Sequence, residues 1–253
     1  MKILAITNQK GGVGKTTTSI NLAASLAAAG RRVLLVDLDP QGNATMGSGV
    51  DKNALTHTIY HVLLGELSIR EVRVDVTNGK YDLLPANRNL AGAEVEMVDL
   101  PERETRLKSA LQNVMNEYDY ILIDCPPALN LLTLNGLCTA HAVMIPMQCE
   151  YFALEGLSDL VNTIKKVRAN FNPPLRIEGL LRTMFDPRNI LSQQVSDQLE
   201  QHFGDKVYRT AIPRNVRLAE APGFGKPALY YDKESKGAQA YLALANEILN
   251  STA

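Results

Sequence analysis

The stretch of sequence that decides the fold lies near the N-terminus, where residues 2–17 read KILAITNQKGGVGKTT. The apolar run at 2–7 predicts a buried strand, and residues 16–29 have the 3.6-residue spacing of a helix. Residues 8–17 join the two through a glycine-rich turn. Such a turn at a helix N-terminus directs backbone N–H groups and the positive end of the helix dipole at one place. The sequence therefore predicts a phosphate-binding loop at residues 8–17.

Each residue type in this loop suits a bound polyphosphate. Gly11, Gly12 and Gly14 let the backbone turn tightly where a side chain would collide with the ligand. Lys15 supplies a positive charge for the outer phosphates, and the hydroxyl of Thr16 can ligate Mg²⁺. A glycine-rich turn that binds nothing is the alternative, which the position of Gly-Lys-Thr between a strand and a helix disfavours.

Short apolar runs alternate with longer helical patterns along the chain. Strands are expected at Lys2–Thr7, Arg32–Asp37, Tyr81–Pro85, Tyr120–Asp124, Ala142–Met147 and Ile177–Met184. Helices are expected at Thr16–Ala29, Glu102–Glu117, Leu131–Ala140, Tyr151–Phe171 and Leu191–Phe203. Strands without polar alternation are typical of a parallel sheet that helices cover on both faces. We predict a single α/β domain over residues 1–253, with binding loops at the carboxyl ends of a mostly parallel, twisted sheet.

Two of the predicted strands end in acidic residues. Residues 33–43 read VLLVDLDPQGN, and residues 120–127 read YILIDCPP. An aspartate just beyond a buried strand lies at the carboxyl edge of the sheet, where it can hold Mg²⁺ or orient an attacking water. A lone aspartate there is more often a turn or cap residue. Two such strands beside a phosphate loop favour the functional interpretation of Asp39 and Asp124.

Composition places the chain among ordinary globular proteins. Its 253 residues are 45% hydrophobic and 21% charged, which argues against disorder and against a fibrous repeat. The formal net charge is −1, so the chain as a whole has no polyanion-binding character. Residues 165–236, however, contain 13 Lys and Arg against 8 Asp and Glu. A near-neutral total thus hides a basic region in the C-terminal third.

The sequence carries no sign of export, of a disulfide framework or of a zinc site. Cys125, Cys138 and Cys149 give an odd count without a CxxC pair. The apolar start of the chain is too short for the core of a signal peptide, and no apolar run approaches the roughly 18 residues that span a bilayer. We expect a cytoplasmic protein.

The phosphate loop departs from the pattern G-x-x-x-x-G-K-[ST], because Gln9 stands where the first glycine belongs and a second lysine, Lys10, precedes the glycines. This arrangement resembles the deviant Walker A motif of the family that contains the ParA/Soj partition ATPases, MinD and the nitrogenase iron protein. Residues 37–43 (DLDPQGN), 146–156 (PMQCEYFALEG) and 212–222 (IPRNVRLAEAP) resemble the ParA/Soj branch in particular. The likeness covers essentially the whole chain.

The resemblance implies a P-loop ATPase that uses ATP and Mg²⁺. Lys15 would bind the phosphates of its own subunit, Lys10 would reach the nucleotide of a partner subunit, and Asp39 would position the attacking water; these three are the implied catalytic residues. A solvated loop charge is the alternative interpretation of Lys10. Thr16, Asp39 and Asp124 would hold the metal. The nucleotide would contact Lys10, Gly11, Gly12, Val13, Gly14, Lys15, Thr16, Thr17, Pro213 and Asn215.

The same resemblance implies a homodimer closed around ATP, non-specific binding of double-stranded DNA, and a ParB-like centromere-binding partner that stimulates hydrolysis. The protein would then segregate chromosomes in association with the nucleoid. The basic region, which with the adenine side spans about residues 182–236, supplies Arg188, Arg214 and Arg217 as candidate contacts to DNA phosphates. Alternatively, Arg188 and Arg217 are solvated or pair with acids such as Asp186 and Glu220. Arg214 could instead serve the adenine-side loop.

Other branches of the family fit less well. A MinD-type protein ends in a basic membrane helix, whereas the last helical pattern here has no Lys or Arg after Lys236, so no membrane contact is expected. An iron-protein-type carrier needs two cysteines per chain, and none precedes Cys125. The chain begins with its first strand, so an operator-reading extension is not expected. A ParA-like scaffold that positions another cargo on the nucleoid or membrane, as MinD does, remains the alternative function.

Overall fold

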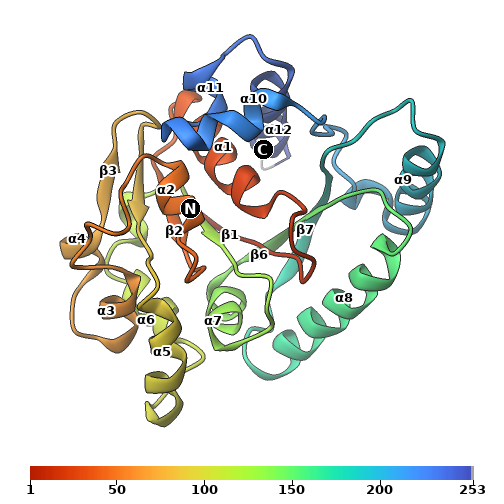
Figure 1. The fold of residues 1–253 in the computed structure, drawn as a ribbon. Coiled ribbons are helices and arrows are strands. Elements are labelled where there is room, and N and C mark those ends of the chain that lie inside the picture. The colour runs from red at the N-terminus through yellow and green to blue at the C-terminus, as the bar shows by residue number, and fades with distance from the viewer. Residues whose placement is uncertain (252–253) are drawn as a thin grey trace.

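The computed structural model describes residues 1–251, through which one seven-stranded sheet runs (Figure 1). The strands are β1 (Lys2–Ile6), β2 (Val33–Asp37), β3 (Val74–Val76), β4 (Tyr81–Leu84), β5 (Tyr120–Asp124), β6 (Ala142–Met147) and β7 (Arg176–Arg182). Their order across the sheet is β3-β4-β2-β5-β1-β6-β7, and neighbouring strands are parallel except β3, which runs antiparallel to β4. The predicted α/β fold with a mostly parallel sheet is confirmed.

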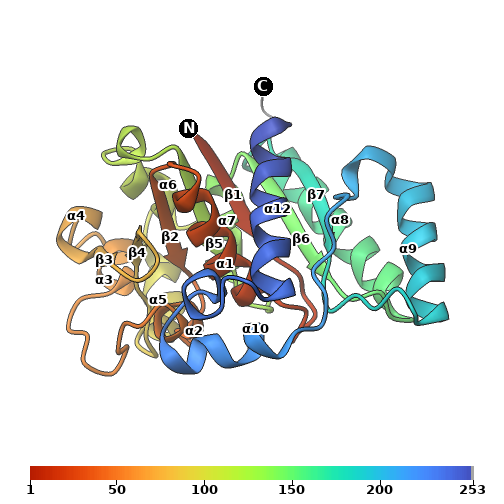
Figure 2. The same cartoon turned by 90° about the horizontal axis from the view of Figure 1, so that it is seen from above.

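Helices cover both faces of the sheet, as predicted (Figures 1 and 2). One face is covered by α1 (Lys15–Ala28), α2 (Asn43–Gly47), α10 (Val216–Glu220), α11 (Ala228–Tyr231) and α12 (Lys236–Asn250). The other is covered by α3 (Ile59–Leu64), α4 (Ile69–Val72), α5 (Leu90–Glu96), α6 (Arg106–Leu111), α7 (Leu131–Thr139), α8 (Ala153–Asn170) and α9 (Ile190–Phe203).

Successive residues of a central strand belong to different hydrophobic cores. Ile3 and Ala5 of β1 pack in the core beneath α7 and α8, whereas Leu4 and Ile6 pack in the core beneath α1 and α12. Because both faces of the strand are buried, apolar residues occupy every position and no polar alternation appears. This explains why continuous apolar runs located the central strands.

The strand register brings the carboxyl ends of three central strands level with one another. Ile6 of β1 lies beside Asp124 of β5, and Asp124 lies beside Asp37 of β2. The segments that leave these strands therefore start from the same edge of the sheet. In Figure 2 this edge lies at the bottom of the view, on the side of α2 and α10.

The last helix, α12, packs along α1, the helix that follows the phosphate loop (Figure 2). Tyr241 of α12 is 1% exposed, and its hydroxyl forms a hydrogen bond of 3.0 Å with that of Thr18 in α1. The backbone N–H of Ala228 donates to Oδ1 of Asn21, also in α1, at 2.7 Å. The last helix therefore docks on the sheet domain through its contacts with α1.

One predicted helix, Glu102–Glu117, is wrong. Only Arg106–Leu111 form an α-helix, a turn follows, and Met115–Glu117 form one 3₁₀ turn. The apolar positions that suggested a longer helix do reach the core, since Leu107, Leu111 and Val114 are buried. Periodic burial is therefore preserved across a segment whose backbone is irregular.

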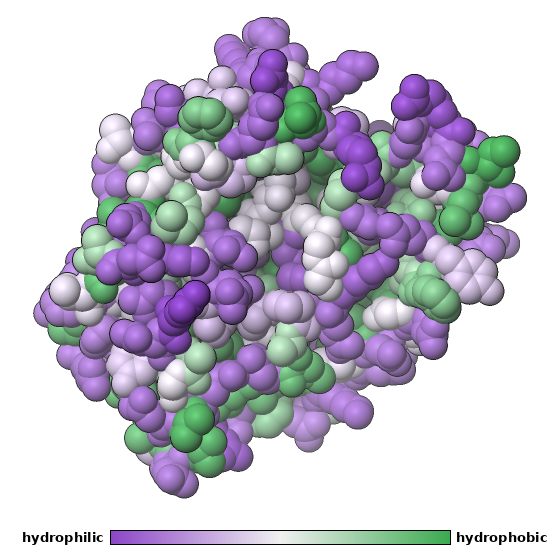
Figure 3. All heavy atoms as spheres, in the orientation of Figure 1, coloured by the Kyte–Doolittle hydropathy of each residue, from purple (hydrophilic) through white to green (hydrophobic). Residues whose placement is uncertain are grey.

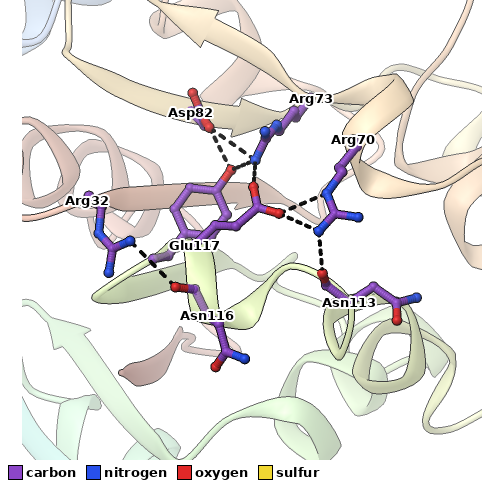
Figure 4. Close-up of polar contacts among 8 residues, drawn as sticks. Arg32, Arg70, Arg73, Asp82, Asn113, Asn116 and Glu117 are labelled. Carbon is purple, nitrogen blue, oxygen red and sulfur yellow. Dashed lines mark hydrogen bonds and ion pairs between the residues drawn. The ribbon is translucent and has the colours of Figure 1, made fainter.

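Arginines from distant segments contact the irregular part of this segment (Figure 4). Arg70 donates from Nη2 to the backbone carbonyl of Asn113 at 2.8 Å, and Arg32 donates to that of Asn116 at 3.5 Å. Arg70 and Arg73 also converge on the carboxylate of Glu117. A helix continued to Glu117 would have used the Asn113 carbonyl in its own hydrogen bonds, whereas the Asn116 carbonyl would have had no partner within such a helix.

Several short elements were not predicted, namely β3, α2, α3, α4, α5, α10 and α11. None is longer than seven residues, which is too short for a helical or strand period to stand out. The predicted strands and the other predicted helices match the observed ones to within two residues at each end, and those at Tyr120–Asp124 and Ala142–Met147 match in full.

Within residues 1–251, no helix is both long enough and apolar enough to cross a membrane.

Candidate functional site

A cavity of about 610 Å³ opens at the carboxyl edge of the sheet and collects most of the residues predicted from the phosphate loop. The loop contributes Gly11, Gly12, Gly14, Lys15, Thr16 and Thr17, and Asp39 faces them from the segment after β2. Figure 3 looks at this side of the molecule, where hydrophilic side chains dominate around a paler centre. The structure thus brings together the two motifs that the sequence placed at separate strand ends.

The backbone of the loop is shaped to receive an anion. Gly12 and Gly14 have φ of 73° and 85°, in the left-handed region that other residues rarely adopt. A Cβ atom at Gly11 or Gly12 would meet no protein atom within 4 Å, so space lies open beside the backbone. The N–H groups of residues 11–17 donate no hydrogen bond to any group within residues 1–251. A row of unpaired donors beside open space fits a polyphosphate.

Lys15 brings a buried positive charge to the loop. Lys15 is only 7% exposed, and its Nζ donates to the backbone carbonyl of Lys10 at 3.0 Å. Burial lowers the pKa of the Lys15 ammonium, and the neighbouring carboxylates of Asp124 and Asp39 oppose that shift. The ammonium is thus held over the loop, with one carbonyl oxygen as its hydrogen-bond partner.

Asp124 ties the loop to the central strand β5. Its Oδ2 accepts a hydrogen bond of 2.8 Å from the hydroxyl of Thr16, and its Oδ1 accepts one of 2.8 Å from the hydroxyl of Ser19. Burial raises the pKa of Asp124 to about 7, and the charge of nearby Asp37 adds to the shift. Sequence analysis missed Ser19, although it stands three residues after Thr16 and so shares its helix face.

Asp37 and Asp39 have different surroundings although only Leu38 separates them. Asp37 is fully buried, and its Oδ2 accepts from both the N–H (2.8 Å) and the hydroxyl (2.7 Å) of Thr45. Burial raises the pKa of Asp37 to about 6. Asp39 is half-buried at the cavity, and its Oδ1 accepts from the N–H of Gln41 at 2.9 Å. Asp37 therefore fastens the segment, and Asp39 faces the cavity.

The metal-binding groups are few. Within residues 1–251 no three side chains of His, Cys, Asp or Glu gather in a way that could hold a metal ion. The Thr16 hydroxyl and the Asp124 carboxylate instead lie 2.8 Å apart beside the phosphate loop. Such a pair suits Mg²⁺, which takes few protein ligands and completes its shell with phosphate oxygens and water.

A second, smaller cavity of about 170 Å³ adjoins the first and shares Gly14, Thr17 and Met184 with it. Pro213 and Asn215, predicted for the adenine side, line this cavity together with Arg214. Oδ1 of Asn215 is occupied as the N-cap of α10, where it accepts from the N–H of Arg217 at 3.1 Å. The position of the smaller cavity suits a base attached to phosphates in the larger one.

Lys10 lies at the rim of the site rather than inside it. Its Nζ forms an ion pair of 2.5 Å with Glu150, and both side chains are about half exposed. Within one subunit Lys10 is therefore paired with a surface carboxylate. Replacement of Glu150 by another anion would break only this exposed ion pair and would leave the loop intact.

Two of the three candidate DNA-binding arginines, Arg188 and Arg217, pair with acids, as the alternative interpretation anticipated. Arg188 contacts Asp186 at 2.9 Å, and Arg217 contacts both Glu220 (2.8 Å) and Asp232 (3.1 Å). Exposed ion pairs of this kind contribute little to stability and give way to a stronger anion.

Arg214 is exposed, and within residues 1–251 it forms no ion pair. It lines the smaller cavity. Its position therefore suits the adenine side of the site as well as a DNA phosphate.

Comparison with known proteins gives one consistent picture. The profile of the AAA domain family matches residues 1–177. The chain is 54% identical over 247 residues to the sporulation initiation inhibitor protein Soj of Bacillus subtilis, and the match covers 98% of each protein. It is 51% identical over 252 residues to the chromosome partitioning protein ParA of Caulobacter vibrioides, which covers 99% of this chain and 94% of that protein.

The fold is similar to a solved structure of cobyrinic acid a,c-diamide synthase from Mycobacterium smegmatis with bound ADP and magnesium. The TM-score is 0.87 at 40% sequence identity, and the match covers 98% of this chain and 94% of that one.

The raised pKa of Asp124 predicts a pH dependence of stability without nucleotide. The folded state holds this proton more tightly than the unfolded chain, so the free energy of unfolding falls as pH rises towards 7, by up to about 1.4 kcal/mol per pH unit. Asp124→Asn removes the charge and keeps partners for both hydroxyls, which can donate or accept. We expect the unfolding free energy of the wild type minus that of D124N, from urea titrations, to fall between pH 5 and pH 7.

Asp186→Asn is the matched control. The Asp186 carboxylate is exposed, and its hydrogen bonds with Arg188 lower its pKa to about 2, so its titration is complete below pH 5. The corresponding difference for D186N should stay constant over the same range. A wild-type minus D124N difference that is flat, or that rises with pH, would contradict a buried carboxyl that prefers its proton.

Proposed function

We propose that this chain, which belongs to the ParA/Soj family of chromosome-partitioning ATPases, closes as a dimer around ATP, binds DNA without sequence preference, and is released when a partner stimulates hydrolysis. The protein is an ATPase whose cofactors are ATP and Mg²⁺. The observation that carries the proposal is the loop of unpaired N–H groups at residues 11–17, which shares one cavity with Lys15, Asp39 and the Thr16–Asp124 pair.

ATP would place its phosphates on the loop and its base in the smaller cavity beside Pro213 and Asn215. The buried Lys15 ammonium and the loop N–H groups stabilise the negative charge that develops on the phosphates during transfer to water. Thr16 and Asp124 would hold Mg²⁺, which neutralises charge on the phosphate oxygens when bound.

Asp39 is the group that would orient the attacking water. It lies at the cavity, and while Oδ1 accepts from Gln41, Oδ2 accepts no hydrogen bond from any group within residues 1–251. A free carboxylate oxygen facing the phosphates can accept a hydrogen bond from water and direct it in line. Hydrolysis without the stimulating partner should be slow, because the ATP state must persist for as long as the DNA-bound state is needed.

Dimer formation would use Lys10. Its ammonium is half exposed at the rim of the cavity and is held by an exposed carboxylate, Glu150. Exchange of that carboxylate for the more highly charged phosphates of a partner's ATP replaces a weak surface pair with a stronger one. Binding of ATP and association of two subunits are then linked, since each nucleotide supplies charge for the other subunit's lysine.

DNA binding would follow from the dimer. One subunit has a net charge of −1 and a basic region whose Arg188 and Arg217 are paired with acids. Two such regions held side by side could replace these exposed ion pairs with contacts to DNA phosphates, none of which reads a base. A ParB-like centromere-binding protein is the proposed partner that ends this state, and nucleoid association is the proposed location.

The first prediction concerns nucleotide affinity. Lys15→Ala should weaken MgATP binding about 100-fold, or about 2.7 kcal/mol, because the buried charge for the outer phosphates is lost. Lys10→Ala is the matched control in the same loop, and the monomer should keep its affinity. Calorimetry on both variants checks this. Near-normal affinity of K15A would remove the loop from its assigned role.

The second prediction separates dimer formation from hydrolysis. Asp39→Ala should lower the rate of ATP hydrolysis at least about tenfold while ATP binding and dimerisation persist, because Asp39 orients water and does not hold the nucleotide. Light scattering of the variant with MgATP reports its mass, with K10A as the variant expected to stay monomeric. A D39A protein that remains monomeric with saturating MgATP would count against this assignment.

The third prediction concerns DNA. Arg188→Glu and Arg217→Glu should lower affinity for every duplex tested, without a change in ATP binding. If four arginines of a dimer each neutralise one phosphate, affinity should fall about 100-fold between 50 and 200 mM salt. Gel shifts on two unrelated duplexes with ATP, ADP and no nucleotide provide the measurement, and binding is expected with ATP only.

Arg32→Glu is the control for these charge reversals. Arg32 is also exposed and paired with an acid, Asp119, but it precedes β2 at the amino edge of the sheet. R32E should bind DNA as the wild type does. Equal loss in all three variants would point to net charge rather than to a defined surface, and equal binding in all nucleotide states would refute the switch.

A further inference from the structure

We infer that Thr183, assisted by Gln148, is a positioning residue of the phosphate loop. These two side chains hold consecutive loop carbonyl groups from outside and thereby direct the N–H groups of Val13 and Gly14 towards the cavity. The inference rests on the proposed ATP-binding function and adds to it the residues that set the shape of the loop.

Thr183 contacts the loop from the residue directly after β7. It is 3% exposed, and its hydroxyl donates to the carbonyl oxygen of Val13 at 2.7 Å. Its own N–H donates to the carbonyl of Met147, the last residue of β6, at 2.9 Å. Thr183 is therefore fixed to the sheet through its backbone and to the loop through its side chain.

Gln148 repeats this arrangement one peptide earlier and from the neighbouring strand. It is the residue directly after β6, and its Nε2 donates to the carbonyl oxygen of Gly12 at 3.3 Å. The same Nε2 lies 3.0 Å from the sulfur of Met184, which follows Thr183. Side chains at two adjacent strand ends thus donate hydrogen bonds to the carbonyl groups of two consecutive loop residues.

Because the peptide group is planar, a hydrogen bond that fixes a loop carbonyl also fixes the direction of the N–H group on the opposite side of the loop. In a trans peptide the carbonyl of one residue and the N–H of the next point in opposite directions. A hold on the Val13 carbonyl therefore turns the Gly14 N–H away from β7, and a hold on the Gly12 carbonyl turns the Val13 N–H away from β6. Both N–H groups are among those with no acceptor within residues 1–251.

An outside hold is needed because the loop has glycine on both sides of Val13. Gly12 and Gly14 are both in the left-handed region, which glycine enters and leaves at little cost. The peptides between them would rotate freely without a fixed partner. The Val13 side chain is 1% exposed and anchors the centre of this segment, and the carbonyl contacts set the orientation of the peptides around it.

The test exploits the shape of Thr183. Thr183→Val keeps the branched side chain, including the methyl group that would lie 3.6 Å from a Cβ at Gly14, and removes only the hydroxyl. Thr183→Ser keeps the hydroxyl and removes the methyl group. We expect T183V to raise the KM for ATP and the Kd for MgADP about tenfold, as for the loss of one hydrogen bond to a charged phosphate. T183S should stay within about threefold of the wild type.

Thr139→Val is the matched control. Thr139 is also buried, and its hydroxyl also donates to a backbone carbonyl at 2.7 Å, that of Asn135, but it lies at the end of α7 away from the loop. T139V and T183V should lose similar stability in urea, whereas only T183V should change KM more than kcat. Such a split indicates a loss of phosphate binding rather than of folded enzyme.

Each outcome decides the inference. A T183V protein with wild-type KM and Kd, or one in which kcat alone falls, overturns it. A T183S protein as weak as T183V would assign the effect to packing and also overturn it. If T183V does not fold, Gln148→Met, which keeps length and loses the donor, should raise the Kd about threefold, and an unchanged value refutes the inference. A wild-type chain that fails to bind ATP would instead refute the proposed function.

Discussion

The contact between Asp124 and the first turn of α1 is the constraint on which the rest of the site depends. The helix begins after Gly14, which offers no side-chain cap, so the hydroxyls of Thr16 and Ser19 fasten its start to the central strand. Burial of the Asp124 carboxyl is costly, and these two hydrogen bonds offset part of that cost. The same contact fixes the distance between the phosphate loop and the sheet, and with it the position of Lys15 above the loop.

Every strand end near the cavity contributes one function to the site. β1 leads into the loop, β5 supplies Asp124, and β2 is followed by Asp39. β6 and β7 are followed by Gln148 and Thr183, which hold the loop from its outer side. The phosphate loop is therefore not a self-contained motif. Its geometry depends on five parallel strands ending at one edge, which explains why a loop of glycines can keep a defined shape.

The parts of this structure that could be predicted have a local signal, and those that could not depend on distant contacts. The loop at 8–17 and the acidic strand ends were recognisable because glycines, a lysine and aspartates at these positions are the residue types that phosphate and Mg²⁺ binding require. The long helix at 102–117 was wrong because its apolar spacing reports burial, and the segment buries Leu107, Leu111 and Val114 with an irregular backbone. Thr183 was not found because a single threonine after a strand has no distinguishing pattern, and the acids beside Arg188 and Arg217 were foreseen only as an alternative.

The packing of α12 on α1 has a consequence for the order of events during synthesis. The helix that carries Lys15 and Thr16 precedes six of the seven strands in the chain, whereas the helix that covers it follows all seven. Until Tyr241 reaches Thr18, part of the apolar surface of α1 faces water, although all seven strands have already been made. Because Tyr241 also lines the smaller cavity, the wall of the nucleotide site is complete only after α12 has been made.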